Sequence, residues 1–241
     1  MKLQFVGVGA AIKTKYHGAS AVVDDHILVD APPACNMLLK KYDLTIDTVF
    51  ITHLHGDHLV GLPFWLLERY VEGIDRDVHI YGPPGLEKKI RDYFAVTFTD
   101  MDIVRYPILG QTYFHSVVPG ETLDLGDVHV TPVEGQHAIT SYGYIFTTDH
   151  ASIYFSGDTE LCPSVLSAID QAGCVVFEGT KKEGKLDTHT TLEELIPIIR
   201  SYPDKEFYIT HRQDYSTDDI TENNIHFPEE GDVFNIRTNR P

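Results

Sequence analysis

The chain alternates short apolar runs with longer amphipathic stretches along most of its length. Runs rich in β-branched and aromatic residues predict strands, at residues 3–6, 19–23, 26–30, 48–51, 78–81, 128–133, 142–146, 152–155, 174–177, 207–209 and, at a sheet edge, 232–236. Apolar residues at helical spacing predict helices at 33–42, 59–71, 85–94, 161–172 and 191–200. Two rounds of hairpins and helices predict an α/β protein, an αβ/βα four-layer sandwich with the helices outside two facing sheets.

Two of these helices carry apolar stripes that we expect to face the core. In the first helix the inward residues should be Met37, Leu38 and Leu39. In the second they should be Leu62, Trp65, Leu66 and Tyr70. His79, in the strand between these helices and the next, has no expected partner and is read as structural or exposed.

Length and composition favour one ordinary globular domain spanning residues 1–241. The chain is 42% hydrophobic and 23% charged, which is typical of such domains. No apolar run approaches a membrane span, and the first residues do not read as a signal peptide. Cys35, Cys162 and Cys174 lie far apart without metal-binding spacing, so we expect reduced thiols and a cytoplasmic protein.

The strongly acidic charge disfavours a long nucleic acid as substrate. The net charge is −17, with 36 acidic against 19 basic residues, whereas proteins that grip polynucleotides usually carry excess Lys and Arg. The one notable basic cluster, Lys181, Lys182 and Lys185, is read as a solvated loop.

The strongest chemical signal is the stretch from His53 to His58, directly after a buried strand. His53 and His55 lie two positions apart, so in extended chain both can reach one point. Asp57 and His58 follow Gly56, where the backbone can turn toward a second point nearby. Imidazole and carboxylate groups are the ligands expected for Zn²⁺, Mn²⁺ or Fe.

This motif, H-x-H-x-D-H, resembles that of the metallo-β-lactamase superfamily, and the longer string from Ile51 to Pro63 resembles its ribonuclease Z branch. The resemblance implies the metallo-β-lactamase fold and a site for two divalent metal ions, zinc first, with manganese or iron as alternatives. It assigns His53, His55 and His137 to one metal. It assigns Asp57, His58 and His211 to the other, with Asp158 bridging the two.

Two further segments resemble motifs of the same branch. Phe177-Glu178-Gly179-Thr180 and Thr188-His189-Thr190-Thr191 correspond to its H-E-x-T and H-S-T segments. By that resemblance His189 protonates the leaving group or stabilises the charged phosphorus centre, and Glu178 fixes its tautomer. His189 and Glu178, together with Asp57, form the expected catalytic set; a surface-loop histidine beside a strand-end carboxylate is the alternative.

Two departures from the branch, together with the acidic charge, point to a small substrate. Enzymes of the branch that process tRNA carry a long arm between the ligands equivalent to His137 and Asp158, but here 21 positions separate them, enough only for a hairpin. The last ligand is followed by Arg212-Gln213-Asp214-Tyr215 instead of Ser-x-Arg-Tyr. A further departure, Phe177 where the motif has His, weakens the match to the H-E-x-T segment.

The leading hypothesis is therefore a dinuclear metal-dependent phosphodiesterase that acts on a small-molecule or short oligonucleotide phosphodiester, such as a cyclic nucleotide or cyclic phosphate. The alternatives are a lactonase or thioesterase at the same metal site, an iron-dependent oxidoreductase, and a binding protein without activity. Long RNA and membranes are not expected as partners, and a homodimer is left open.

Two points stay undecided in the sequence. Asp30, at a strand end, either supports the metal site from behind, as in the superfamily, or caps a turn or helix. The aromatic-rich residues 93–118 either pack over the core or form a lid or dimer contact beside the site.

Overall fold

The computed structural model describes residues 1–98 and 107–237 of the chain. Tyr106, one of the aromatic residues considered for a lid or interface, lies outside these residues. Within the described parts, no helix is both long enough and apolar enough to cross a bilayer.

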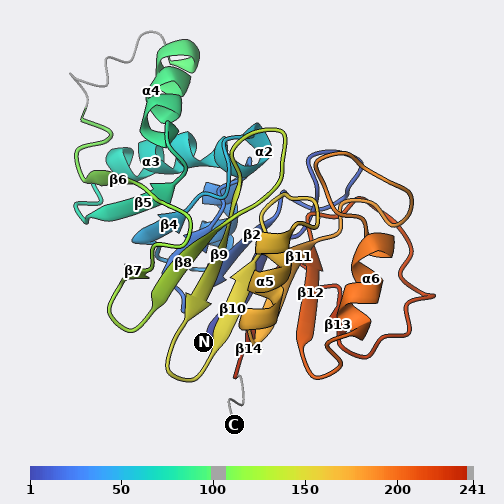
Figure 1. Ribbon diagram of the computed structural model, residues 1–241. Coiled ribbons are helices and arrows are strands. Elements are labelled where there is room, and N and C mark those ends of the chain that lie inside the picture. Colours follow the sequence, from blue (N-terminus) through green and yellow to red (C-terminus); the bar gives the residue numbers. More distant parts are fainter. Residues whose placement is uncertain (99–106, 238–241) are drawn as a thin grey trace.

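Two seven-stranded sheets form the centre of the molecule (Figure 1). The first has the order β14-β1-β2-β3-β4-β5-β6, with bounds Val233–Asn235, Lys2–Gly7, Ser20–Val23, Ile27–Val29, Thr48–Phe50, Val78–Gly82 and Thr112–Ser116. The second has the order β13-β12-β11-β10-β9-β8-β7, with bounds Ile225–His226, Glu206–Thr210, Cys174–Glu178, Ser152–Phe155, Tyr142–Thr147, His129–Glu134 and Leu123–Asp124. Strands β3 to β6 run parallel, as do β10 to β13.

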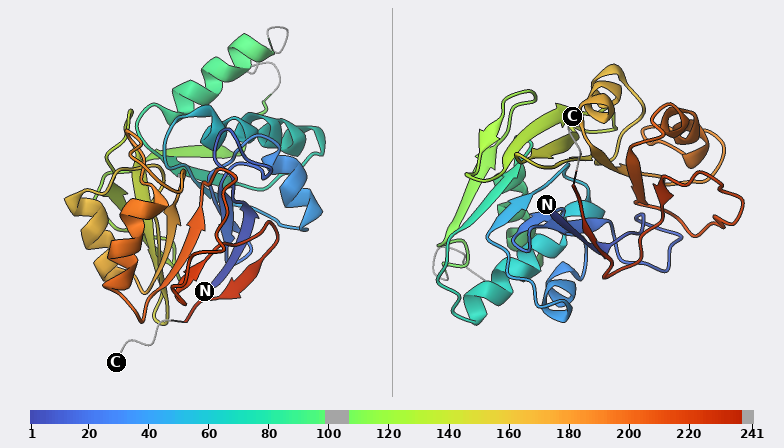
Figure 2. Two further views of the ribbon diagram at one scale, coloured as in Figure 1. Left: turned by 90° about the vertical axis from the view of Figure 1, so that its right-hand side faces the viewer. Right: turned by 90° about the horizontal axis from the view of Figure 1, so that it is seen from below.

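Helices cover the outer faces of both sheets. The helices are α1 (Cys35–Lys41), α2 (Gly56–Leu59), α3 (Gly61–Val71), α4 (Leu86–Thr97), α5 (Pro163–Gln171) and α6 (Leu192–Arg200). Two views at right angles show α5 and α6 on the side of the molecule opposite α1 and α3 (Figure 2). Buried residues of α1, α3 and α4 pack on the first sheet. Buried residues of α5 and α6 pack on the second sheet. A further cluster of buried side chains fills the space between the two sheets. The expected αβ/βα sandwich is confirmed.

Most expected elements are present, with shifts of one to three residues at their ends, the largest at the end of α4. The hairpin between β2 and β3 and the edge strand β14 are confirmed. Thr191 caps α6, and Glu194 completes a capping box there. The expected helix at 59–71 begins two residues later, at Gly61, as α3, and residues 56–59 of the metal motif form the separate short helix α2. The short strands β6, β7 and β13 were not expected, because their polar residues show no clear apolar alternation.

Three side-chain expectations are wrong. Met37 is 68% exposed, because only Cys35, Leu38 and Leu39 share the buried face of α1. Tyr70 is exposed as well, and Arg69 is buried on α3 in its place, with its guanidinium 5.1 Å from the centre of the Trp65 ring. His79 does have a partner, since its Nδ1 lies 3.0 Å from Nε2 of His115 on β6.

Candidate metal centre

The sheet topology brings the carboxyl ends of β3, β4, β10, β11 and β12 to one edge of the sandwich. Parallel neighbours within each sheet end at the same side, and β8 runs in the direction of β10 because both are antiparallel to β9. The residues that follow these strands carry the expected chemistry, and they include His53, His137, Asp158 and His211. They are far apart in the sequence and adjacent in space.

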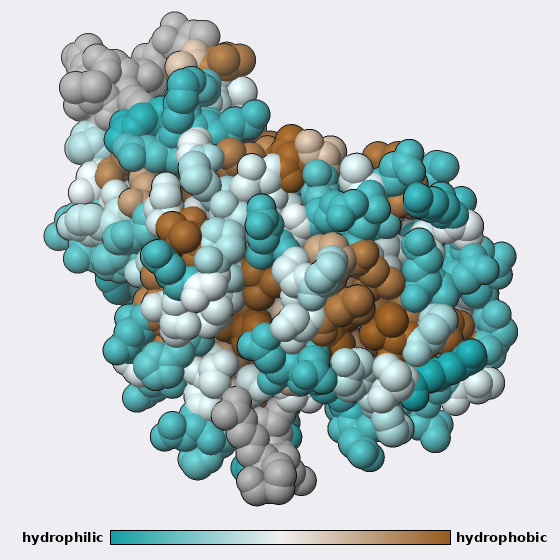
Figure 3. All heavy atoms as spheres, in the orientation of Figure 1, coloured by the Kyte–Doolittle hydropathy of each residue, from teal (hydrophilic) through white to brown (hydrophobic). Residues whose placement is uncertain are grey.

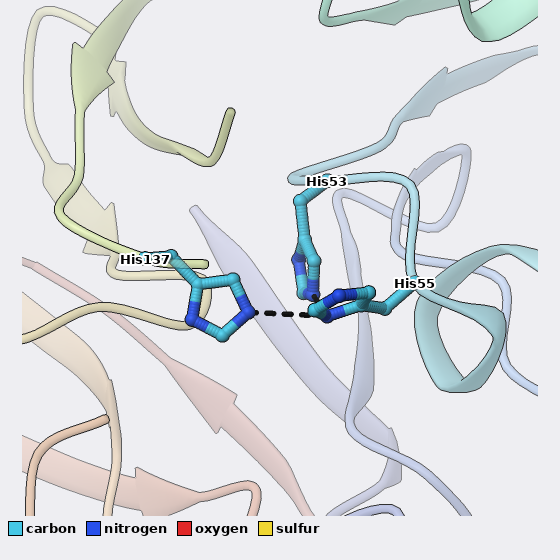
Figure 4. A group of neighbouring side chains, drawn as sticks. All are labelled: His53, His55 and His137. Atoms are coloured by element: carbon cyan, nitrogen blue, oxygen red, sulfur yellow. Dashed lines mark hydrogen bonds between the residues drawn. The ribbon is translucent and has the colours of Figure 1, made fainter. Parts of the chain in front are cut away.

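Three histidines form a first group. His55 Nδ1 lies 3.0 Å from His53 Nε2 and 3.1 Å from His137 Nε2 (Figure 4). Burial, with the neighbouring His58 charge, lowers the pKa of His53 to about 2. Burial also lowers the pKa of His137. Both rings are therefore neutral at physiological pH, which is the form that binds metals.

Hydrogen bonds fix where the ring protons lie in this group. The Thr52 hydroxyl donates to Asp30 Oδ2, so it accepts a hydrogen bond from His53 Nδ1–H at 3.0 Å. His137 Nδ1–H donates to the Thr188 carbonyl oxygen at 2.6 Å. The Nε2 atoms of His53 and His137 are consequently unprotonated, and their lone pairs converge with His55 Nδ1 on one point. Converging nitrogen lone pairs are the arrangement that a shared cation satisfies.

A second group joins Asp57, His58, Asp158 and His211. Asp158 Oδ2 lies 3.4 Å from both His58 Nε2 and His211 Nε2, and 3.7 Å from His53 Nε2 of the first group. Asp57 Oδ2 lies 3.3 Å from His211 Nε2. Asp158 therefore contacts both groups of candidate ligands, and the ligand assignment that the resemblance implies stays a prediction.

Two buried polar atoms in this group lack a hydrogen bond in the described part of the protein: His58 Nε2 and Asp158 Oδ1. An unsatisfied buried polar atom is costly. Burial alone would raise the pKa of Asp158, but the charges of His211 and His58 hold it well below its usual range. A buried carboxylate that faces two imidazole Nε2 atoms supplies the ligand types that divalent metal ions prefer.

Residues behind the ligands set their orientation. Asp30 accepts hydrogen bonds from the Thr52 amide at 2.8 Å and from His58 Nδ1–H at 2.7 Å. Asp30 thus contacts the site from behind, and it caps no helix. Thr180 donates its hydroxyl proton to Glu178 Oε2 at 2.6 Å and so accepts one from His211 Nδ1–H at 2.7 Å.

The contribution of Thr52 and Thr180 was not foreseen in the sequence. The one available signal was a threonine next to a strand-end His or Glu, and such threonines are common. What distinguishes these two is that both hydroxyls are buried against ligand rings, which only the fold reveals.

The backbone at the site takes conformations that most residues avoid. Asp30 (φ 59°), Thr188 (φ 67°) and His211 (φ 47°) all lie in the left-handed region. Gly157, one residue before Asp158, has φ 59° and would place a Cβ 2.9 Å from Thr52 Cβ and 3.0 Å from the Tyr142 carbonyl oxygen. Such strain clusters at functional sites, where surrounding contacts hold it.

His189 and Glu178 lie beside both groups. His189 Nδ1 is 2.9 Å from Glu178 Oε2 and 3.7 Å from Asp158 Oδ2, and its ring stacks on His211. Burial alone would lower the pKa of His189, but the hydrogen bond and charge of Glu178 raise it. The hairpin β9–β10 occupies the segment between His137 and Asp158, as the 21-residue spacing predicted.

This sandwich, with its ligands at the carboxyl ends of the strands, defines the metallo-β-lactamase fold. A metallo-β-lactamase fold protein, YhfI from Bacillus subtilis, superimposes with a TM-score of 0.77 at 18% identity, over 97% of this chain and 99% of the other. The short form of human tRNase Z superimposes equally well, with a TM-score of 0.77, 21% identity and coverage of 98% and 99%.

Sequence comparisons identify the family within this fold class. Ribonuclease Z of Shouchella clausii is 31% identical over 154 residues, which are 60% of this chain and 47% of that protein. The chain thus spans about half the length of such curated relatives. Residues 1–234 match the family described as anti-Pycsar protein Apyc1, and the chain belongs to that family. It is a member of the metallo-β-lactamase superfamily, in the ribonuclease Z-like branch.

Proposed function

We propose that this protein is a metal-dependent phosphodiesterase that hydrolyses small or short phosphodiesters. The observation that carries the proposal is the position of His189. Its ring contacts His137 and His211, one from each group of ligands, while Glu178 holds its Nδ1. The likeness to ribonuclease Z supports phosphodiester chemistry.

We assign two divalent metal ions to the site, with zinc as first candidate. His53, His55 and His137 would hold one; Asp57, His58 and His211 would hold the other; Asp158 would contact both. Divalent ions held by these ligands would coordinate phosphate oxygens of the substrate and lower the pKa of a coordinated water. Asp30, Thr52, Thr180 and the Thr188 carbonyl keep the ligand rings in position.

The protein itself supplies the proton for the leaving group. Glu178 accepts hydrogen bonds from the Thr159 amide at 2.5 Å, the Thr180 hydroxyl and His189 Nδ1–H. With these three bonds Glu178 is better suited to orient His189 than to bind a metal, although it lies near Asp158 and His211. The oriented imidazolium has its Nε2–H available for the departing oxygen.

Charge and fold both favour a small substrate. The net charge of −17 opposes a polyanion. The segment between β9 and β10 closes in a short turn, so no arm extends from it to hold a large RNA.

Metal analysis and a substrate panel test this function. Protein loaded with Zn²⁺ or Mn²⁺ should cleave bis(p-nitrophenyl) phosphate, cyclic nucleotides or short oligonucleotides faster than precursor tRNA, a lactone or a thioester. Asp158→Ala should lose most metal and activity. Asp149→Ala, at the exposed turn of the same hairpin, should keep both. Faster turnover of the lactone or thioester, or efficient processing of precursor tRNA, would contradict the proposal.

A further inference from the structure

Three loops that carry proposed site residues meet at the edge of the sandwich where the parallel strands end (Figure 1). They are residues 135–141 with His137, residues 156–162 with Asp158, and residues 179–191 with His189. Glu160, which is neither a proposed ligand nor one of the proposed catalytic residues, lies where these loops join. The surface over the loop before α6, at the upper right of Figure 3, is mainly hydrophilic, so water competes for the polar groups there.

The Glu160 side chain connects the other two loops to its own. Its Oε1 accepts a hydrogen bond from the Thr188 amide at 3.0 Å, and its Oε2 accepts one from Gln136 Nε2 at 3.2 Å. Its main-chain amide donates to the Gln136 carbonyl oxygen at 2.8 Å. Within the described residues Glu160 forms no ion pair, so its carboxylate binds a main-chain amide and a side-chain amide only.

Thr188 closes these contacts into a ring of hydrogen bonds. Its carbonyl oxygen accepts a hydrogen bond from His137 Nδ1–H at 2.6 Å, while its amide donates to Glu160. Through Glu160 the ring returns to Gln136, the residue directly before His137. Because the ring is closed, loss of the Glu160 carboxylate releases both the loop of His137 and the loop of His189.

The backbone at Thr188 needs such support. Thr188 has φ 67°, a left-handed conformation that β-branched residues rarely adopt and that surrounding contacts must hold. The bond from its amide to Glu160 fixes this peptide on its N-terminal side. Without that bond the backbone can relax to a negative φ, which turns the carbonyl away from His137 and displaces the next residue, His189.

We propose that Glu160 is a positioning residue for the reaction: through Thr188 it orients the ring of the proposed ligand His137 and sets the place of the proton donor His189. Metal binding and proton donation would then both depend on one carboxylate that accepts no hydrogen bond from a ligand ring. The part of the inference that concerns His189 rests on the proposed function.

Hydrogen exchange in the metal-free protein tests the link without any activity. In Glu160→Ala the Thr188 amide, followed by ¹⁵N NMR, should exchange about tenfold faster, because it loses its acceptor. Glu160→Gln should keep the exchange slow, because its amide oxygen still accepts that bond. The control Glu121→Ala, at an exposed turn carboxylate, should leave the exchange unchanged. Unchanged exchange in Glu160→Ala would overturn the proposal.

Metal affinity and rates test the two consequences. In Glu160→Ala the affinity for one of two Zn²⁺ equivalents, measured by chelator competition, should fall about 10- to 100-fold. At saturating metal, kcat for an alkyl diester should fall about 10- to 100-fold with KM unchanged, as expected for a misplaced proton donor. A p-nitrophenyl diester should slow much less. Glu160→Gln should restore both the affinity and the alkyl rate.

Two outcomes separate positioning from mere stabilisation. If Glu160→Ala lowers the melting temperature but leaves the metal affinity and the ratio of alkyl to p-nitrophenyl rates unchanged, the carboxylate is only a stabilising contact and the proposal is overturned. A Glu160→Gln variant as impaired as Glu160→Ala would overturn it too. An unmodified protein that binds two metals but cleaves no diester would refute the proposed function alone, and the loss of metal affinity in Glu160→Ala would still support the role at His137.

Discussion

Replacement of His189 by alanine tests the chemistry most directly. The ring is partly exposed, with 20% of its side-chain surface accessible, and Glu178 is its hydrogen-bond partner at Nδ1. His189 is not among the seven proposed ligands, so His189→Ala should keep its metal content. The variant should lose the proton that the leaving oxygen needs.

The expected magnitude follows from that single role. General acid catalysis contributes typically ~10²–10⁴ in rate, which corresponds to about 2.7–5.5 kcal/mol of transition-state stabilisation. An alkyl diester needs the full contribution because its leaving alkoxide is strongly basic. A p-nitrophenyl diester needs little of it, because its leaving group is stable without a proton.

The assay compares kcat for one alkyl and one p-nitrophenyl diester, with metal content measured on the same samples. We expect the alkyl substrate to slow by at least about a hundredfold and the aryl substrate much less. Glu178→Gln should show the same selectivity in weaker form. His129→Ala, an exposed histidine on β8, is the matched control. If both rates are unchanged in His189→Ala at full metal content, the proton-donor role is refuted and the lactonase or thioesterase alternative gains.

Two further predictions concern metal binding. Asp30→Asn removes the carboxylate that accepts hydrogen bonds from His58 Nδ1–H and from the Thr52 amide. Metal affinity, measured by chelator competition, should therefore fall about 10- to 100-fold. The control Asp25→Asn changes an exposed carboxylate and should leave the metal affinity unchanged. Burial would lower the pKa of His58, but the charges of Asp158 and Asp30 raise it well above its usual value, so the metal-free ring is protonated near neutral pH. Because metal binding through Nε2 must release that proton, the apparent affinity for the metal should rise with pH. Calorimetry in buffers of different protonation enthalpy should detect the released proton. If no proton is released, the assignment of a protonated His58 is wrong.

The sequence by itself determined the fold class and the chemical types at the site. Buried strands consist of apolar residues because both of their faces are covered, so the strands before His53, Asp158 and His211 could be predicted from their apolar runs. The spacing from His53 to His58 marked a metal motif, and the short gap from His137 to Asp158 excluded a long insertion. Each of these signals is local in the chain.

The tertiary structure decided what depends on contacts between distant segments. The sequence left Asp30 between two roles, and only the packing of β3 beside β4 places it against His58 and Thr52. The proton positions on His53 and His211 follow from threonine hydroxyls that give no signal of their own in the sequence. Glu160 reads as an ordinary polar residue before a helix until the fold brings the Thr188 amide to its carboxylate. Hydrophobic pattern specifies which elements form, whereas the identity of a side chain's neighbours depends on how the sheets and helices pack.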